Sequence, residues 1–269
     1  MTRYGPQFGP DITFLGVDRC DWSEPETYAD ADVVILGAPF DGGTSHRAGT
    51  RFGPQHIRQT CYLPHDGSRP SLALRVDALQ DLRVYDAGDV EFGSLIGHGQ
   101  PMRRLIESGA LRGDRFLQMG LRGYWPGPET LEWMARQRMR SYEMTEIGAR
   151  GLRECLTEAF GTATDDCEGV FLSVDIDVCD PGHAPGTGTP EPGGLTAREL
   201  LDSVRRIAYE LPVAGIDVVE VSPPYDHAEI TSFLANRVVL EALSGIARRR
   251  RDAADGTTWN PRQPLLDGR

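Results

Sequence analysis

Short apolar runs that end at glycine, proline or aspartate recur along the chain, separated by segments with helical spacing of apolar residues. Runs of this kind are typical of buried parallel strands. We expect strands at residues 33–39, 83–90, 116–121, 173–178 and 214–221. Helices are expected to begin near Gly53 and Thr196, and to cover residues 100–108, 129–138 and 230–248. The alternation predicts an α/β fold, with a parallel sheet flanked by helices on both faces.

The chain has 269 residues, of which 39% are hydrophobic, and no internal segment has the composition of a linker. We therefore expect one α/β domain over residues 31–248. Residues 1–30 show no clear period and are expected to form an extended N-terminal arm. Residues 249–269 are rich in arginine, aspartate, glycine and proline, and are expected to form a polar C-terminal tail.

The stretch from Ser173 to Pro190 carries the strongest chemical signal in the chain. Successive side chains of a strand alternate between its two faces, so Asp175 and Asp177 are expected on one face, opposite Val174 and Ile176. Two adjacent carboxylates repel each other unless a cation lies between them, and such oxygen ligands suit Mg²⁺ or Mn²⁺. The alternative is a solvated pair without a function, which the following Gly-Thr-Gly-Thr-Pro loop makes less attractive.

Composition excludes several functional classes. The net charge of −12 argues against nucleic acid or an anionic membrane surface as a partner. All 28 basic residues are arginine, so a lysine Schiff base is excluded. The five cysteines are scattered and suggest reduced thiols, and no apolar run approaches the ~20 residues of a membrane span. We expect a cytoplasmic protein.

Several segments together resemble the ureohydrolase family of arginase, agmatinase and related amidinohydrolases, with the greatest similarity to the agmatinase branch. The resemblance covers roughly residues 10–248. It is carried by Gly37-Ala38-Pro39-Phe40-Asp41-Gly42-Gly43-Thr44, Arg51-Phe52-Gly53-Pro54, Tyr85-Asp86-Ala87-Gly88-Asp89-Val90, His98-Gly99-Gln100-Pro101, Gln118-Met119-Gly120-Leu121-Arg122-Gly123, residues 175–190 and Glu220-Val221-Ser222-Pro223-Pro224-Tyr225-Asp226-His227.

The resemblance implies hydrolysis of a guanidino compound to urea and an amine at a two-manganese centre, with agmatine as the favoured substrate. Guanidinobutyrate and guanidinopropionate remain alternatives. The resemblance makes Asp175 and Asp177 metal ligands. It assigns Glu220 to the substrate guanidinium and His98 to proton transfer, and it places Thr189 in the substrate site. It also implies a homo-oligomer, trimeric or hexameric. Each role has a simpler alternative: Glu220 could be an ion-paired carboxylate, and His98 a loop histidine.

The chain departs from this family between Val90 and His98. The family carries its other four metal ligands in a Gly-Gly-Asp-His-Ser and an Asp-Ala-His-x-Asp motif, which ordinarily lie in this interval. Only seven residues, 91–97, occupy it here, and neither motif occurs elsewhere. The missing part corresponds to two βα units, on the order of 60 residues. We therefore expect an arginase-like fold that lacks about two central βα units.

Two hypotheses follow from this departure. The first is an amidinohydrolase with an internal deletion and one weak metal site or none, since two carboxylates supply too few ligands to fix two metals ~3.5–4 Å apart. The second is a catalytically impaired pseudoenzyme that acts as a subunit of a family oligomer. His183 and His227 lie in loops near the expected site, but no metal-type spacing supports either as a replacement ligand.

Overall fold

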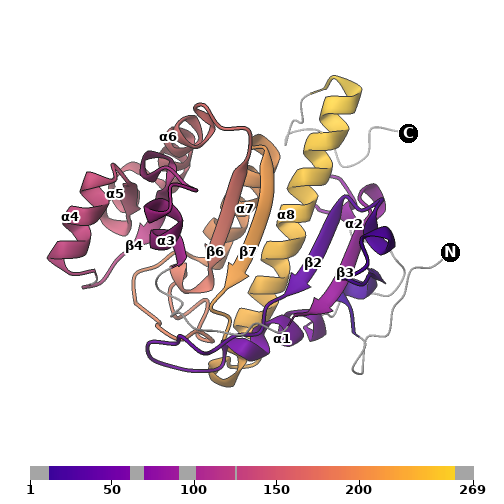
Figure 1. Cartoon of the computed structure of the whole chain (residues 1–269), viewed down its shortest axis with the longest axis horizontal. Helices are drawn as coiled ribbons and strands as arrows, with labels where there is room; N and C mark the ends of the chain where they lie inside the picture. The colour runs from indigo at the N-terminus through magenta and orange to yellow at the C-terminus, as the bar shows by residue number, and fades with distance from the viewer. Residues whose placement is uncertain (1–11, 61–69, 91–100, 125, 258–269) are drawn as a thin grey trace.

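The computed structural model describes residues 12–60, 70–90, 101–124 and 126–257, which form parallel strands with helices packed against them (Figure 1). This part of the chain contains seven strands. They are β1 (Asp18–Arg19), β2 (Val33–Gly37), β3 (Val84–Asp89), β4 (Leu117–Leu121), β5 (Arg140–Glu143), β6 (Val170–Asp175) and β7 (Val213–Val219). Four of the five expected strands are confirmed as β2, β3, β4 and β7, with small shifts at their ends. The fifth, expected at 173–178, is found as β6 at Val170–Asp175, and residues 176–178 form a 3₁₀ turn instead.

The same part of the chain contains eight α-helices and six 3₁₀ turns. The helices are α1 (Gly53–Gln59), α2 (Ala78–Asp81), α3 (Pro101–Glu107), α4 (Pro128–Arg136), α5 (Met144–Arg150), α6 (Leu152–Thr164), α7 (Ala197–Glu210) and α8 (Ile230–Asp255). The turns are η1 (Phe14–Gly16), η2 (Pro25–Tyr28), η3 (Thr50–Phe52), η4 (Gly113–Arg115), η5 (Ile176–Val178) and η6 (Pro223–Tyr225). The predicted start of α7 is confirmed, because Thr196 and Glu199 form a reciprocal capping box.

The strands pair in three separate sheets rather than one. Their orders are β1-β3-β2, β4-β5 and β6-β7, and all the strand pairs are parallel. Figure 1 shows the sheets side by side: β4 lies beyond β6 on one side of the centre, and β2 and β3 lie beyond β7 on the other. Among the described residues, the paired sheet is thus interrupted twice, between β4 and β6 and between β7 and β2. This architecture agrees with an arginase-like fold that lacks central strands.

Helix α8 organises the core. Leu234, Ala235, Val238 and Ala242 pack into the cluster that β6, β7 and α7 form, while Leu243 and Ala247 belong to a second cluster with Phe14 and the β2–β3 side. This helix is long and apolar enough to cross a membrane by length and composition, but 61% of its most apolar window is buried inside the protein. Its contacts with both clusters make α8 a core helix of the described fold.

Two expected boundaries differ from the structure. Helix α8 continues to Asp255, beyond the expected end at Arg248, because Asp252 accepts hydrogen bonds from the Arg248 guanidinium at 2.9 Å and the Tyr209 hydroxyl at 2.8 Å. The start of the expected polar tail, residues 249–255, is therefore helical.

The expected N-terminal arm is also partly built into the domain. Phe14 is 1% exposed and its N–H donates to Asp86 Oδ2 at 2.8 Å, while β1 pairs with β3. These contacts join residues about 70 positions apart, so the local pattern of the first thirty residues does not reveal them.

Candidate functional site

The two aspartates of the central motif lie at the carboxyl end of β6, but they do not share a strand face. Strand β6 ends at Asp175, and Asp177 lies in the 3₁₀ turn η5. The turn forms because Asp175 Oδ1 accepts a hydrogen bond from the Asp177 N–H at 3.1 Å. The expectation of a continuous strand is therefore wrong at this point. Val174 and Ile176 are buried as expected, at 4% and 0% exposure.

Negative charge accumulates around Asp175. Burial raises the pKa of Asp175 well above its ordinary value, and the neighbouring carboxylates of Asp177 and Glu220 raise that pKa further. Carboxylates assembled in this way favour either a proton or a cation among them. The electrostatics therefore suit a divalent cation at the end of β6.

Thr189 lies beside this pair. Its hydroxyl donates a hydrogen bond to Asp177 Oδ2 at 2.9 Å. The contact brings the Gly-Thr-Gly-Thr-Pro loop onto the same carboxylate that follows β6. The geometry thus joins two candidate site residues that the sequence separates by twelve positions.

Glu220 follows the last residue of β7 and faces the same loop. A Cβ atom placed on Gly188 would lie 3.4 Å from Glu220 Oε2 and 3.3 Å from the Arg47 carbonyl oxygen. Glu220 also has a φ of 63°, in the left-handed region that side-chain-bearing residues adopt at a cost. Strain of this kind persists where the surrounding structure holds it, and it concentrates at functional sites.

Arg122 is a site residue to which sequence analysis gave no role. Its guanidinium donates hydrogen bonds to the carbonyl oxygens of Asp177 at 2.7 Å, Cys179 at 3.1 Å and Glu191 at 2.5 Å. It thereby ties the end of β4 to the turn that carries Asp177. The only sequence signal was its place in the Gln-Met-Gly-Leu-Arg-Gly segment.

Asp226 fixes the loop that follows Glu220. Its carboxylate accepts hydrogen bonds from the N–H groups of Thr231 and Ser232, both at 2.8 Å. The Thr231 hydroxyl in turn accepts one from the Gly186 N–H at 2.8 Å. Asp226 and the Gly186 end of the Thr189 loop are therefore both bound to the start of α8.

The remaining candidate residues are histidines. His98 lies outside the described residues. His183 and His227 are both exposed, and within the described ranges no group of three or more histidine, cysteine, aspartate or glutamate side chains is arranged to hold a metal ion. Burial raises the pKa of Cys179 to about 12, so its thiol stays protonated near neutral pH.

The site fits manganese only in part. Asp175 and Asp177 offer oxygen ligands of the right kind, yet a cation that prefers about six ligands would take most of the others from water. The described residues do not form a two-metal centre. These residues form an acidic candidate site at the carboxyl ends of parallel strands, the usual place for a binding site in such sheets.

The fold and the geometry of the site define a class of protein: an α/β protein with an acidic site at the ends of its strands. The Arginase family model matches residues 31–96 and 91–245, and the chain belongs to the arginase family. A proclavaminate amidinohydrolase of Streptomyces clavuligerus is 34% identical, with 93% of this chain and 97% of that protein covered. An agmatinase of Bacillus cereus is 31% identical, with coverages of 81% and 93%.

Solved structures agree with this assignment. The proclavaminate amidinohydrolase of S. clavuligerus has a TM-score of 0.77 at 28% identity, and the match covers 91% of this chain and 100% of that one. A formimidoylglutamase of Bacillus subtilis also has a TM-score of 0.77, at 24% identity, and shows the shared fold alone.

The comparisons also bear on the expected shortening. The two family matches meet at residues 91–96, directly after β3. The alignment with the proclavaminate amidinohydrolase extends over 316 positions, although it includes only 93% of the 269 residues here, or about 250. About 65 positions of the alignment therefore have no counterpart in this chain. This number is close to the length of two βα units.

Proposed function

We propose that this protein is an amidinohydrolase that acts on a small guanidino compound, with agmatine as the favoured substrate and urea and an amine as products. The observation that carries the proposal is the meeting of Asp175, Asp177, Thr189 and Glu220 at the ends of β6 and β7, in a chain of the arginase family. Relatives named guanidinobutyrase and agmatinase support a guanidino substrate without choosing between them.

The proposal gives each residue a part. Glu220 binds the cationic guanidinium, and the Thr189 hydroxyl orients the Asp177 carboxylate. Asp175 and Asp177 would hold Mn²⁺, which in such sites acidifies a bound water. His98 is proposed to pass a proton to the leaving amine. The proposal includes a homo-oligomer in the cytoplasm, as expected from the sequence.

A second candidate function has an observation of its own. Among the described residues no three-ligand metal group is present, and about 65 alignment positions have no counterpart here. A catalytically impaired subunit that assembles with intact members of the family would retain the acidic site without turning over substrate.

Urea release tests both candidates. The full chain is assayed with agmatine, 4-guanidinobutyrate and 3-guanidinopropionate across a Mn²⁺ titration, beside Glu220→Gln and a control, Glu168→Gln, at an acidic residue that forms no part of the site. Metal-dependent urea release that Glu220→Gln abolishes and Glu168→Gln retains supports the amidinohydrolase.

Absence of urea with every substrate and metal level contradicts activity of this chain. Co-purification with a co-expressed intact family member would then support the impaired subunit, with the mass of the complex measured by light scattering. A chain that remains alone and inactive contradicts both candidates.

A further inference from the structure

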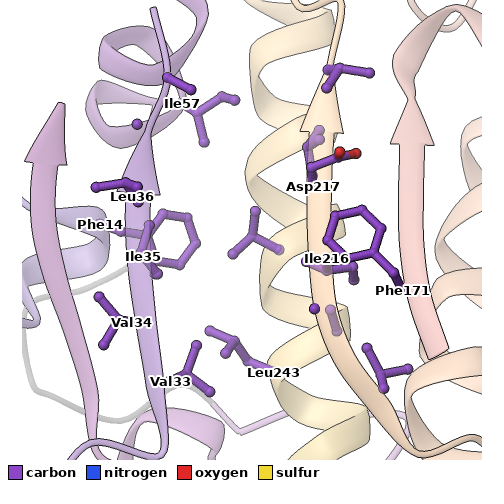
Figure 2. Close-up of a pocket in the computed structure, with 18 of the residues that line it drawn as sticks. Phe14, Val33, Val34, Ile35, Leu36, Ile57, Phe171, Ile216, Asp217 and Leu243 are labelled. Carbon is purple, nitrogen blue, oxygen red and sulfur yellow. The ribbon is translucent and has the colours of Figure 1, made fainter. Parts of the chain in front are cut away.

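A large cavity separates two of the sheets. It lies between β2 and β7, has a volume of about 1270 Å³, and is floored by α8 (Figure 2). The β2 wall includes Val33 and Ile35, the β7 wall includes Ile216 and Asp217, and Leu243 projects from α8. We call this space the β2–β7 cavity. It exceeds the ~300–1,000 Å³ of ordinary small-molecule pockets.

Both walls of the β2–β7 cavity are edges of strands. In the described part of the chain, β2 pairs with β3 alone and β7 pairs with β6 alone. Each strand therefore turns one row of backbone N–H and C=O groups away from its partner, on the side where the cavity lies. Such groups demand hydrogen bonds when water is excluded. An apolar small molecule could cover the floor but could not satisfy two strand edges at once.

A single parallel strand satisfies all of these requirements. It offers N–H and C=O groups along both of its sides, as peptides do when they extend a sheet. Its flanking strands have five and seven residues, so a strand of similar length would span roughly 17–23 Å at ~3.3 Å per residue. Side chains turned toward α8 would meet Val239, Leu243 and Ile246, and so should be apolar.

The sequence comparison indicates where such a strand comes from. The two family matches meet directly after β3, and we infer that the roughly 65 alignment positions without a counterpart belong there. Strand β3 pairs with β2, whose other edge forms the cavity wall. A strand that follows β3 needs only to cross β2 to reach that wall, and a crossover of this kind is the usual connection between parallel strands.

We propose that the β2–β7 cavity is an acceptor site for one parallel β-strand supplied by a separate polypeptide, equivalent to the segment that relatives carry after β3. Binding of this strand joins the β1-β3-β2 and β6-β7 sheets into one. The partner is thus an extended, largely apolar segment that binds by backbone pairing.

The test supplies such a segment to the intact chain. The probe is the part of the S. clavuligerus proclavaminate amidinohydrolase that has no counterpart here, made both as one polypeptide and as overlapping peptides of about 12 residues, longer than a typical strand. Binding is measured by calorimetry, and protection of β2 and β7 amides by hydrogen exchange. We expect at least one probe to bind and to slow exchange along both strands about tenfold or more.

Two matched variants locate the binding. Leu36 lines the β2–β7 cavity and is 36% exposed, whereas Leu72 is 77% exposed and does not line it. Leu36→Arg should weaken probe binding about tenfold or more by placing a charge where an apolar strand docks, and Leu72→Arg should leave it unchanged. Circular dichroism confirms that both variants fold.

Three outcomes would overturn the proposal. The first is that no probe binds, or that one binds without protecting both strands. The second is that β2 and β7 amides are already protected along both edges in the monomeric chain, which would mean that the chain covers its own cavity. The third is protection that grows with protein concentration alongside dimer formation, which would make a second copy the occupant. None of these readouts depends on catalysis, so failure here is distinct from failure of the proposed function.

Discussion

The Thr189 hydroxyl donates a 2.9 Å hydrogen bond to Oδ2 of Asp177, while the N–H of Asp177 donates to Oδ1 of Asp175. The Asp177 carboxylate is therefore oriented from the glycine-rich loop, and its backbone is oriented from the end of β6. With its backbone and its carboxylate both held, Asp177 offers the remaining lone pairs of that carboxylate in a fixed direction. Preorganisation of this kind strengthens the binding of a cation or a guanidinium group.

Thr189→Val should weaken Mn²⁺ binding, because valine keeps the shape of threonine and removes the donor. Loss of one such hydrogen bond is worth about 0.5–1.5 kcal/mol, or roughly a two- to tenfold rise in Kd. Manganese electron paramagnetic resonance measures the free ion directly. Thr189→Ser retains the hydroxyl and serves as the control, with an affinity near that of the parent. A parent chain that binds no Mn²⁺ would contradict the metal role of the pair itself.

Arg122→Ala should lower the free energy of unfolding by about 2–3 kcal/mol, because several partly buried carbonyl oxygens around the Asp177 turn lose their shared donor. Urea-induced unfolding provides the measurement. Arg138→Ala is the matched control, since Arg138 is 77% exposed and pairs with Asp114 at the surface, where ion pairs contribute little. Equal losses in the two variants would show that Arg122 does not hold the turn.

Local patterns predicted the strands that consist of one continuous apolar run, such as β2 and β7. They also predicted the start of α7, because the capping box at Thr196 is a local motif. The residues of the acidic site could be named from motif resemblance, and Thr189 and Asp177 do make contact. What the sequence could not provide was how these motifs are held together.

The missing information is long-range. Arg122 reaches Asp177 across 55 positions, and Phe14 reaches Asp86 across 72, so no local period indicates either contact. The end of β6 at Asp175 depends on a side-chain hydrogen bond that competes with the strand ladder. The missing motifs allowed a shortening near Val90 to be inferred from the sequence. That the sheet is interrupted on both sides of the β6-β7 pair could be seen only from the order of the strands in space.

Arg58→Leu should destabilise the fold by about 3–5 kcal/mol, because Asp86 is 0% exposed and would keep a buried charge without its guanidinium partner. Arg58 donates to both oxygens of Asp86, at 2.8 and 2.9 Å, which makes the pair bidentate. Urea-induced unfolding again gives the free energy. Arg83→Leu, at an exposed ion pair with Asp30, should cost under about 1 kcal/mol.

The double variant Arg58→Leu with Asp86→Asn distinguishes charge from packing. It removes the buried charge together with its partner, so it should be more stable than Arg58→Leu alone. A double variant as unstable as or less stable than the single one would indicate that the loss comes from packing.

Asp217→Asn should stabilise the protein at neutral pH. Burial raises the pKa of Asp217, and the hydrogen bond from the Ser173 hydroxyl at 2.6 Å offsets that rise only in part. A raised pKa means that the folded state binds the proton more tightly than the unfolded state. This contribution to stability is complete below the unfolded pKa of about 3.9 and is lost as pH rises through the folded value.

The pH dependence provides the test. Asparagine can still accept from Ser173 but carries no charge, so the advantage of Asp217→Asn over the parent should be small near pH 4 and grow toward pH 7. Urea-induced unfolding at a series of pH values measures it, with Asp166→Asn, at a side chain 84% exposed, as the control. A stability advantage that stays constant across this range would show that the charge of Asp217 does not destabilise the fold. It would then follow that this side chain is well solvated beside the β2–β7 cavity.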